Sequence, residues 1–180
     1  MKKPHGRRSS IDRRGEDATR SGTERSRRRK SFRPFDPELD FGVLSRLTGF
    51  GLRRAQLLVF SRFARSVEDK TVTPLRFSML ALIGANPGLQ QAQLAQALGL
   101  SRPTATVTID YWQRRHCLER RSDPRDRRSN GIHITPEGRG ALAALQKVVL
   151  AHDRELTDHL ADGEVEELRR LLEKLYSRSD

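Results

Sequence analysis

Residues 90–116 read QQAQLAQALGLSRPTATVTIDYWQRRH. Apolar residues recur at helical spacing up to Leu98, and Gly99 stands where a helix end favours a residue that accepts a left-handed conformation. Ser101 then has the position of an N-cap for a further helix, with Pro103 in its first turn. Two helices joined by a short glycine-containing turn are typical of a helix-turn-helix motif.

The residues that follow have the pattern of a β-hairpin. The second helix of the motif has an apolar inner face of Ala105, Ile109 and Trp112. Residues 117–121 and 131–135 then have short strand character, and they flank a polar loop over 122–130 that is dense in arginine and aspartate. A helix-turn-helix followed by such a hairpin, or wing, predicts a winged helix-turn-helix.

Long helical periodicity flanks this motif on both sides. The apolar steps predict a first helix over 40–68 and a second helix that starts at Thr73 and ends before Asn86. After the hairpin they predict a fifth helix over 135–160 and a sixth helix capped by Asp162. The predicted fold is therefore mainly α, with a small β-hairpin wing.

The charge of the chain is strongly basic and uneven. The 180 residues include 35 Lys plus Arg against 23 Asp plus Glu, a formal net charge of +12. Such an excess points to a polyanion, which can be nucleic acid, an anionic membrane surface or a phosphorylated ligand.

The basic excess is concentrated at the start of the chain. Residues 1–36 hold 13 basic and 5 acidic side chains and almost no core-forming ones, so we predict a disordered basic arm followed by one domain over 37–180. The arm either tracks a phosphate backbone or is a solvating tail.

Several classes of protein are excluded at this stage. One cysteine can form neither an internal disulfide nor a cysteine-based zinc site, which indicates an intracellular, cytoplasmic protein. No apolar run has the length of a membrane span, and we expect no secretory signal and no membrane partner. We also find no phosphate-cradling glycine motif, no recognisable nucleophile and base, and no metal cluster, so an enzyme, a metal site and a cofactor are not expected.

The start of the second motif helix is chemically suited to a DNA major groove. Hydroxyl groups and arginine can meet base edges there, and valine can meet a thymine methyl group. The predicted contacts are Ser101, Arg102, Pro103, Thr104, Thr106 and Val107. In the loop, arginines fit an electronegative minor groove, and aspartates can orient them. The alternative for the loop is a solvated hairpin of mixed charge.

Four short segments together resemble the MarR family of transcriptional regulators. They are LGLSRPT at 98–104, LERR at 118–121, DPRDRR at 123–128 and ITPEG at 134–138, within a match over about 40–178. The resemblance implies a homodimer of winged helix-turn-helix protomers on a pseudo-palindromic operator, released by a small ligand, often aromatic, or by an oxidant. It also implies that the helices over 40–68 and 136–178 form the dimerisation region and that 73–135 forms the winged helix-turn-helix.

The resemblance assigns roles in the wing by position. Arg128 matches the wing-tip arginine that enters the minor groove, Asp126 matches the acid that steadies it, and Arg125 is a further candidate contact. This chain departs from the pattern at Val107, where a basic residue is frequent. It also has His116 and Cys117 where Gly and Leu usually end the recognition helix, so that helix must end without a permissive glycine.

The resemblance further implies an effector pocket between the first, second and fifth helices. Candidate lining residues are Phe50, Arg53, Arg54, Leu57, Phe60, Phe77 and Leu80. Core packing is the alternative for each apolar residue. The two arginines either receive the carboxylate or phosphate of an aromatic acid or its coenzyme A thioester, or pair with acids of the partner chain.

Two further features have competing interpretations. Cys117 lies among cations that can lower a thiol pKa, but buried packing is favoured over a redox role. His152 and His159 are seven residues apart on one helix, yet two ligands do not make a zinc site.

The sequence thus predicts a dimeric, sequence-specific DNA-binding regulator, a repressor released from its operator by an aromatic acid or its coenzyme A thioester. The alternative is a nonspecific architectural nucleic-acid-binding protein driven by the basic arm.

Overall fold

The computed structural model describes residues 36, 38–122 and 130–177. The chain divides into two units, and the described residues all lie in the second, Ser31–Asp180. The predicted basic arm, 1–36, therefore lies outside the described residues except for Asp36. None of the helices in these ranges is both long and apolar enough to cross a membrane.

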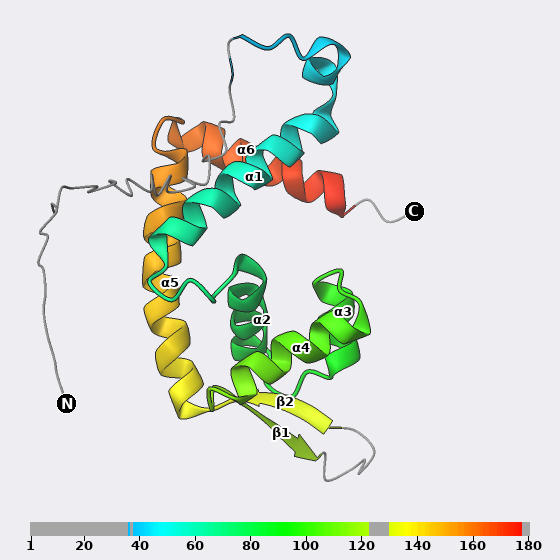
Figure 1. The fold of residues 1–180 in the computed structure, drawn as a ribbon, viewed down its shortest axis with the longest axis vertical. Coiled ribbons are helices and arrows are strands. Elements are labelled where there is room, and N and C mark those ends of the chain that lie inside the picture. Colours follow the sequence, from blue (N-terminus) through cyan, green and yellow to red (C-terminus); the bar gives the residue numbers. More distant parts are fainter. Residues whose placement is uncertain (1–35, 37, 123–129, 178–180) are drawn as a thin grey trace, which may run out of the picture. The chain divides into compact units, whose positions relative to one another are not determined.

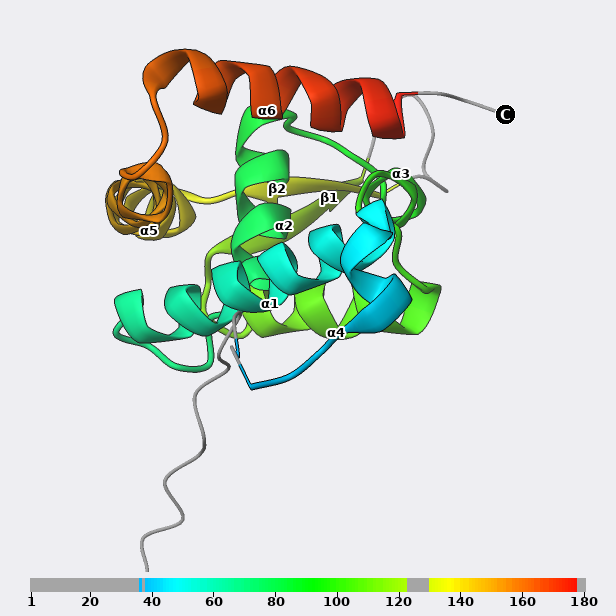
Figure 2. The same cartoon turned by 90° about the horizontal axis from the view of Figure 1, so that it is seen from above.

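The element order confirms the predicted fold class (Figure 1). A 3₁₀ helix η1 (Gly42–Arg46) precedes α1 (Thr48–Ser66), α2 (Pro74–Ala85), α3 (Gln91–Ala97), α4 (Arg102–Gln113), β1 (Leu118–Ser122), β2 (Asn130–Ile134), α5 (Pro136–Thr157) and α6 (Asp162–Tyr176). The two strands pair antiparallel, with Leu118 opposite Ile134 and Ser122 opposite Asn130. Seen from above, α5 points along the line of sight and α6 runs crosswise to it (Figure 2).

The prediction of a single helix over 40–68 is wrong, because the helical conformation is interrupted at Leu47. This residue has extended backbone angles (φ −93°, ψ 117°), and its N–H closes the 3₁₀ turn by donating to the carbonyl oxygen of Leu44. Gly49 and Gly51 begin α1, and glycine lowers helix propensity by about 1 kcal/mol relative to alanine. The apolar periodicity continues across the break, so the pattern alone could not reveal it.

The helix-turn-helix forms as its local signals predicted. Gly99 adopts φ +61°, and the next N–H, that of Leu100, donates to the Ala95 carbonyl oxygen over 2.8 Å. Ser101 is the N-cap of α4, with its Oγ accepting from the Thr104 N–H over 3.3 Å. The cap and the left-handed glycine together set the tight turn between α3 and α4.

The end of α4 is stabilised without a glycine at position 116. The helix ends at Gln113, three residues before the predicted end, and His116 takes the left-handed conformation with φ +55°. That conformation costs a non-glycine residue about 1 to 2 kcal/mol. Two hydrogen bonds hold it: the His116 carbonyl accepts from Thr135 Oγ1 (2.6 Å), and the following N–H, of Cys117, donates to the Trp112 carbonyl (3.0 Å).

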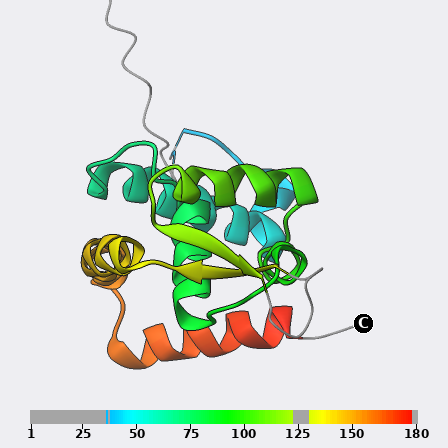
Figure 3. The ribbon, with the colours of Figure 1, turned by 90° about the horizontal axis from the view of Figure 1, so that it is seen from below.

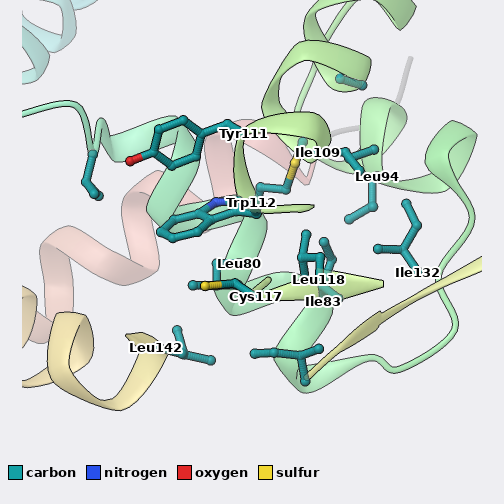
Figure 4. Close-up of a cluster of buried hydrophobic side chains, with 14 of the residues drawn as sticks. Leu80, Ile83, Leu94, Ile109, Tyr111, Trp112, Cys117, Leu118, Ile132 and Leu142 are labelled. Atoms are coloured by element: carbon teal, nitrogen blue, oxygen red, sulfur yellow. The ribbon is translucent and has the colours of Figure 1, made fainter. Parts of the chain in front are cut away.

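The core lies between α2, α3, α4, the hairpin and the first turns of α5 (Figure 4). Its largest fully buried side chains are Met79, Leu80, Ile83, Leu94, Ile109 and Ile132. Figure 3 shows the hairpin from below. In addition to pairing with β1, β2 forms an isolated antiparallel bridge with the α2–α3 loop, between Ile132 and Leu89. The hairpin is thereby part of the same core as the helix-turn-helix.

One capping prediction in the last helix is wrong. Asp162 is the first residue of α6, and Ala161 is its N-cap. The exposed N–H of Ala161 instead donates to Glu164 Oε2 over 2.9 Å. The acid that satisfies the helix start is thus Glu164, the third residue of the first turn.

The junction between β2 and α5 gives a first testable prediction. A Cβ added at the buried Gly138 would collide with the backbone carbonyl of Cys117 and lie 2.8 Å from Ile134 Cγ1, whereas one added at Gly140 meets nothing within 4 Å. Gly138→Ala should therefore lower the free energy of unfolding by about 1 to 3 kcal/mol. Gly140→Ala should leave it unchanged or raise it by up to about 1 kcal/mol. Urea unfolding of the two variants decides the matter, and equal stability would contradict this packing.

Candidate nucleic-acid interface

Helix α4 has two chemically opposite faces. Ala105 and Ile109 are fully buried in the core, and the indole of buried Trp112 donates to the carbonyl oxygen of Arg76 over 2.9 Å. The start of the helix is exposed instead, at Ser101, Arg102, Pro103, Thr104 and Val107. Five of the six predicted DNA contacts on α4 are therefore accessible together.

The exposed residues offer mixed chemistry. Ser101 Oγ and Thr104 Oγ1 lie 2.8 Å apart and share a hydrogen bond. Arg102 forms no ion pair within the described ranges, so its guanidinium is available. Val107 exposes 58% of its surface and adds an apolar group to this exposed face.

Thr106 differs from the other five. It is half-buried, its Oγ1 donates to the Arg102 carbonyl over 3.0 Å, and the same oxygen accepts from Gln91 Nε2 over 2.7 Å. Because its only proton is committed to Arg102, Thr106 cannot at the same time donate to a base edge.

Sequence reasoning missed three residues that join the wing to the helices. Arg120 on β1 donates through its guanidinium to Gln91 Oε1 (3.0 Å) and Gln113 Oε1 (3.4 Å). Gln91 lies 29 residues before Arg120 in the sequence, and Gln113 lies 7 residues before it. Both glutamines lie in the helix-turn-helix stretch, but nothing in that local pattern indicates that they contact β1, because only the fold brings Arg120 to them.

The predicted wing contacts lie in the loop that joins the two strands. Arg125, Asp126 and Arg128 fall within 123–129, outside the described residues. The strands on either side are described, and Ser122 Oγ donates to Asn130 Oδ1 over 3.3 Å where the loop leaves them. The three wing contacts stay predictions.

The loop between α1 and α2 holds the far end of α4. The phenol ring of Tyr111 lies between two guanidinium groups, with Arg76 Cζ 3.7 Å and Arg115 Cζ 3.9 Å from its centroid. Asp69 accepts from Thr71 and from Arg115 (3.2 Å), and these bonds, those from Thr71 first, hold the pKa of the Asp69 carboxyl below its usual range. Asp69 is thus ionised at neutral pH, as its pairing with Arg115 requires.

The predicted effector residues have different environments. Leu80 is fully buried in the core, and half-buried Phe77 packs against it, which fits the core-packing alternative for both. The two arginines also diverge. Arg53 is exposed, whereas Arg54 Cζ lies 4.7 Å above the Phe41 ring and 5.6 Å from that of Phe50. Among the remaining candidates, Leu57 and Phe60 are exposed.

A polar groove of about 580 Å³ lies between α1 and α5. It is lined by Arg62, Arg65, Ser66, His152, Glu155 and Asp158. His152 is only 5% exposed, packs edge-on against Phe63, and its Nε2 has no hydrogen-bond partner in the described part of the chain. His159 is exposed beside Asp158, so the two histidines do not come together.

Cys117 has the environment of a packing residue. Its side chain is 5% exposed, and burial raises the pKa of the thiol despite the nearby positive charge of Arg115. A raised pKa disfavours the reactive thiolate. The structure supports the packing interpretation over the redox one.

Apolar side chains remain exposed on the outer helices. They are Leu39, Val43, Leu44, Leu47, Leu52, Leu57 and Phe60 before and along α1, and Leu168, Leu171, Leu175 and Tyr176 on α6. Neither η1 nor α6 has a buried residue. These two sets are called the outer apolar surfaces below.

Comparisons with known proteins agree with this architecture. The model of the MarR family matches residues 70–129. A putative transcriptional regulatory protein for the hcr operon of Thauera aromatica is 36% identical over 140 residues, which cover 77% of this chain and 84% of that protein.

Two solved structures of the transcriptional repressor CouR are also similar. CouR bound to a 23-mer DNA duplex has a TM-score of 0.73 and 38% identity, covering 77% of this chain and 99% of that chain. CouR bound to p-coumaroyl-CoA has a TM-score of 0.71 and 34% identity, covering 79% and 100%. With its helix-turn-helix and its two-stranded wing in one core, this chain belongs to the MarR family of winged-helix transcriptional regulators.

Proposed function

We propose that this chain is a dimeric repressor that binds a pseudo-palindromic operator and is released by an aromatic acid or its coenzyme A thioester. The observation that carries the proposal is the two-faced helix α4, whose buried side fixes it in the core while its N-terminal residues stay exposed. A regulator of this kind acts by binding and catalyses no reaction. The test is selective binding to an operator duplex.

The exposed start of α4 supplies the base contacts in this proposal. Arg102 can donate to guanine, the hydroxyls of Ser101 and Thr104 can bond to either kind of base edge, and Val107 can contact a thymine methyl group. Pro103 fixes the backbone of the first turn. These groups enter the major groove, whereas Arg125, Asp126 and Arg128 of the wing loop are assigned to the adjacent minor groove.

Dimerisation follows from the outer apolar surfaces. Helix α6 has an apolar stripe but no buried residue. Covering that stripe with another surface would therefore remove apolar area from water and lower the free energy. A second copy of the chain is the partner that the family resemblance implies. Two recognition helices in one dimer would then meet half-sites about one helical turn apart, roughly 34 to 36 Å.

The proposed effector class rests on relatedness and chemistry. The similar repressor CouR has been solved with p-coumaroyl-CoA, an aryl thioester with an anionic nucleotide end. In this chain the segment 41–60 combines aromatic side chains with cations, including Arg54 over two phenyl rings. An effector that favours a different spacing of the two recognition helices would release the operator by population shift.

In this proposal the basic segment 1–36 makes a contribution to DNA affinity that does not depend on the DNA sequence. Its 13 basic side chains can neutralise DNA phosphates and release counterions. It raises affinity for any duplex, so specificity rests on α4 and the wing.

Replacing Arg102 tests the base-contact assignment. Arg102→Ala should weaken binding to the operator by about 1 to 3 kcal/mol, because a side chain that reads a base edge is lost. Arg154→Ala, which removes an equal charge from the exposed face of α5, should change operator affinity far less. Fluorescence anisotropy titrations measure both. Equal losses in the two variants would contradict a specific role for Arg102.

Replacing Leu171 tests the dimer. The side chain exposes 49% of its surface on α6, and Leu171→Glu would place a charge in the covered interface. We expect the dimer dissociation constant to rise about 30-fold or more, as for an interface anchor worth about 2 kcal/mol. Arg170→Glu adds negative charge to the same helix at an exposed residue paired with Glu167, and should leave the dimer intact. Sedimentation velocity gives the readout, and a dimeric Leu171→Glu would exclude this surface.

A further inference from the structure

The Thr106 hydroxyl on the recognition helix α4 is oriented by a residue of another helix. Gln91, the first residue of α3, donates from Nε2 to Thr106 Oγ1 over 2.7 Å, while Thr106 donates to the Arg102 carbonyl over 3.0 Å. The direction of these bonds is fixed, because the single hydroxyl proton is already used and only the amide nitrogen can supply another.

The other end of the same amide contacts the wing. Gln91 Oε1 accepts from the Arg120 guanidinium over 3.0 Å, and Arg120 Nε donates to Oε1 of Gln113, the last residue of α4, over 3.4 Å. Arginine is donor-only, so Oε1 must face Arg120 and the amide cannot flip without breaking both contacts. One side chain therefore spans α3, α4 and β1.

The position of this network matters for DNA reading. Helices α3 and α4 contact each other, α4 contacts β1, and the wing loop leaves the far end of β1 (Figure 1). The exposed start of α4 and the wing loop must reach neighbouring grooves of one duplex at the same time. A hydrogen-bonded link between the middle of α4 and the middle of β1 constrains their relative placement.

We propose that Gln91 is a positioning residue for operator specificity, which acts by holding the recognition helix, through Thr106, in register with the wing strand, through Arg120. This inference rests on the proposed DNA-binding function. Base-edge hydrogen bonds need aligned donors and acceptors, whereas phosphate contacts tolerate displacement. Loss of the link therefore lowers discrimination between sequences more than it lowers affinity for DNA in general.

The test compares the full-length chain with four variants on two duplexes. A preferred duplex is first enriched from a random library by the wild-type protein, and a scrambled duplex of equal composition is the reference. Gln91→Ala should reduce the ratio of the two dissociation constants about 5- to 10-fold, as expected for the loss of one or two hydrogen bonds. Its affinity for the scrambled duplex and its salt dependence should stay at wild-type values. Thermal unfolding confirms that each variant is folded.

Two controls separate positioning from other roles. Gln96→Ala removes an exposed glutamine from the same helix and should keep the wild-type ratio. The double variant with Arg120→Ala should lose no more discrimination than Arg120→Ala alone, because both changes break one link.

Each outcome decides between distinct claims. Additive losses would mean that Gln91 contacts DNA itself, and an unchanged ratio in Gln91→Ala would mean that the link has no effect on reading; either result overturns the inference while leaving the repressor proposal intact. A wild-type protein that enriches no sequence and binds both duplexes equally would overturn the proposed function together with the inference.

Discussion

The architecture depends on the burial of the inner face of α4. Ala105, Ile109 and Trp112 lie in the core, and a fully buried side chain of the size of isoleucine contributes about 1.5 to 3 kcal/mol. The indole of Trp112 is satisfied by the carbonyl of Arg76, which ties the recognition helix to α2. With that face fixed, the exposed residues Ser101, Arg102, Pro103, Thr104 and Val107 are held in one rigid array. The base contacts proposed for the start of α4 are therefore a consequence of core packing.

The elements predicted correctly were those with local causes. The structural roles of Ser101 and Gly99 depend on hydrogen bonds between residues at most five positions apart, so they can be predicted from the local sequence. The break at Leu47 was missed because apolar spacing continues through it, and periodicity reports burial rather than backbone angles. The exposed set on α4 was predicted because it is the complement of an apolar stripe. Gln91 was not, because its partner Arg120 is 29 residues away and only the fold brings them together.

The described helices also indicate how a signal from the dimer region could reach DNA. The α1–α2 loop is tied to α4 through Asp69, Arg115 and the ring of Tyr111, while α1 packs against α5. Under the proposed function, these packed and hydrogen-bonded groups would transmit a change in the angle of α1 to the end of the recognition helix. In the role proposed for Gln91, its hydrogen bonds to Thr106 and Arg120 would keep β1 in register with that helix. In a dimer, movements of such rigid units would change the distance between the two winged helix-turn-helix units and leave the structure of each unchanged.

The central claim is that this rigid array selects an operator and that an aryl effector releases it. The most direct measurement is fluorescence anisotropy of the full-length protein on the duplex upstream of its own gene and on a scrambled duplex, with and without p-coumaroyl-CoA and a panel of aromatic acids. The account predicts an operator dissociation constant lower by roughly a thousandfold or more, and release by one of these compounds. Equal binding to both duplexes, unmoved by every compound, would contradict it and favour a nonspecific binder driven by the basic residues at 1–36.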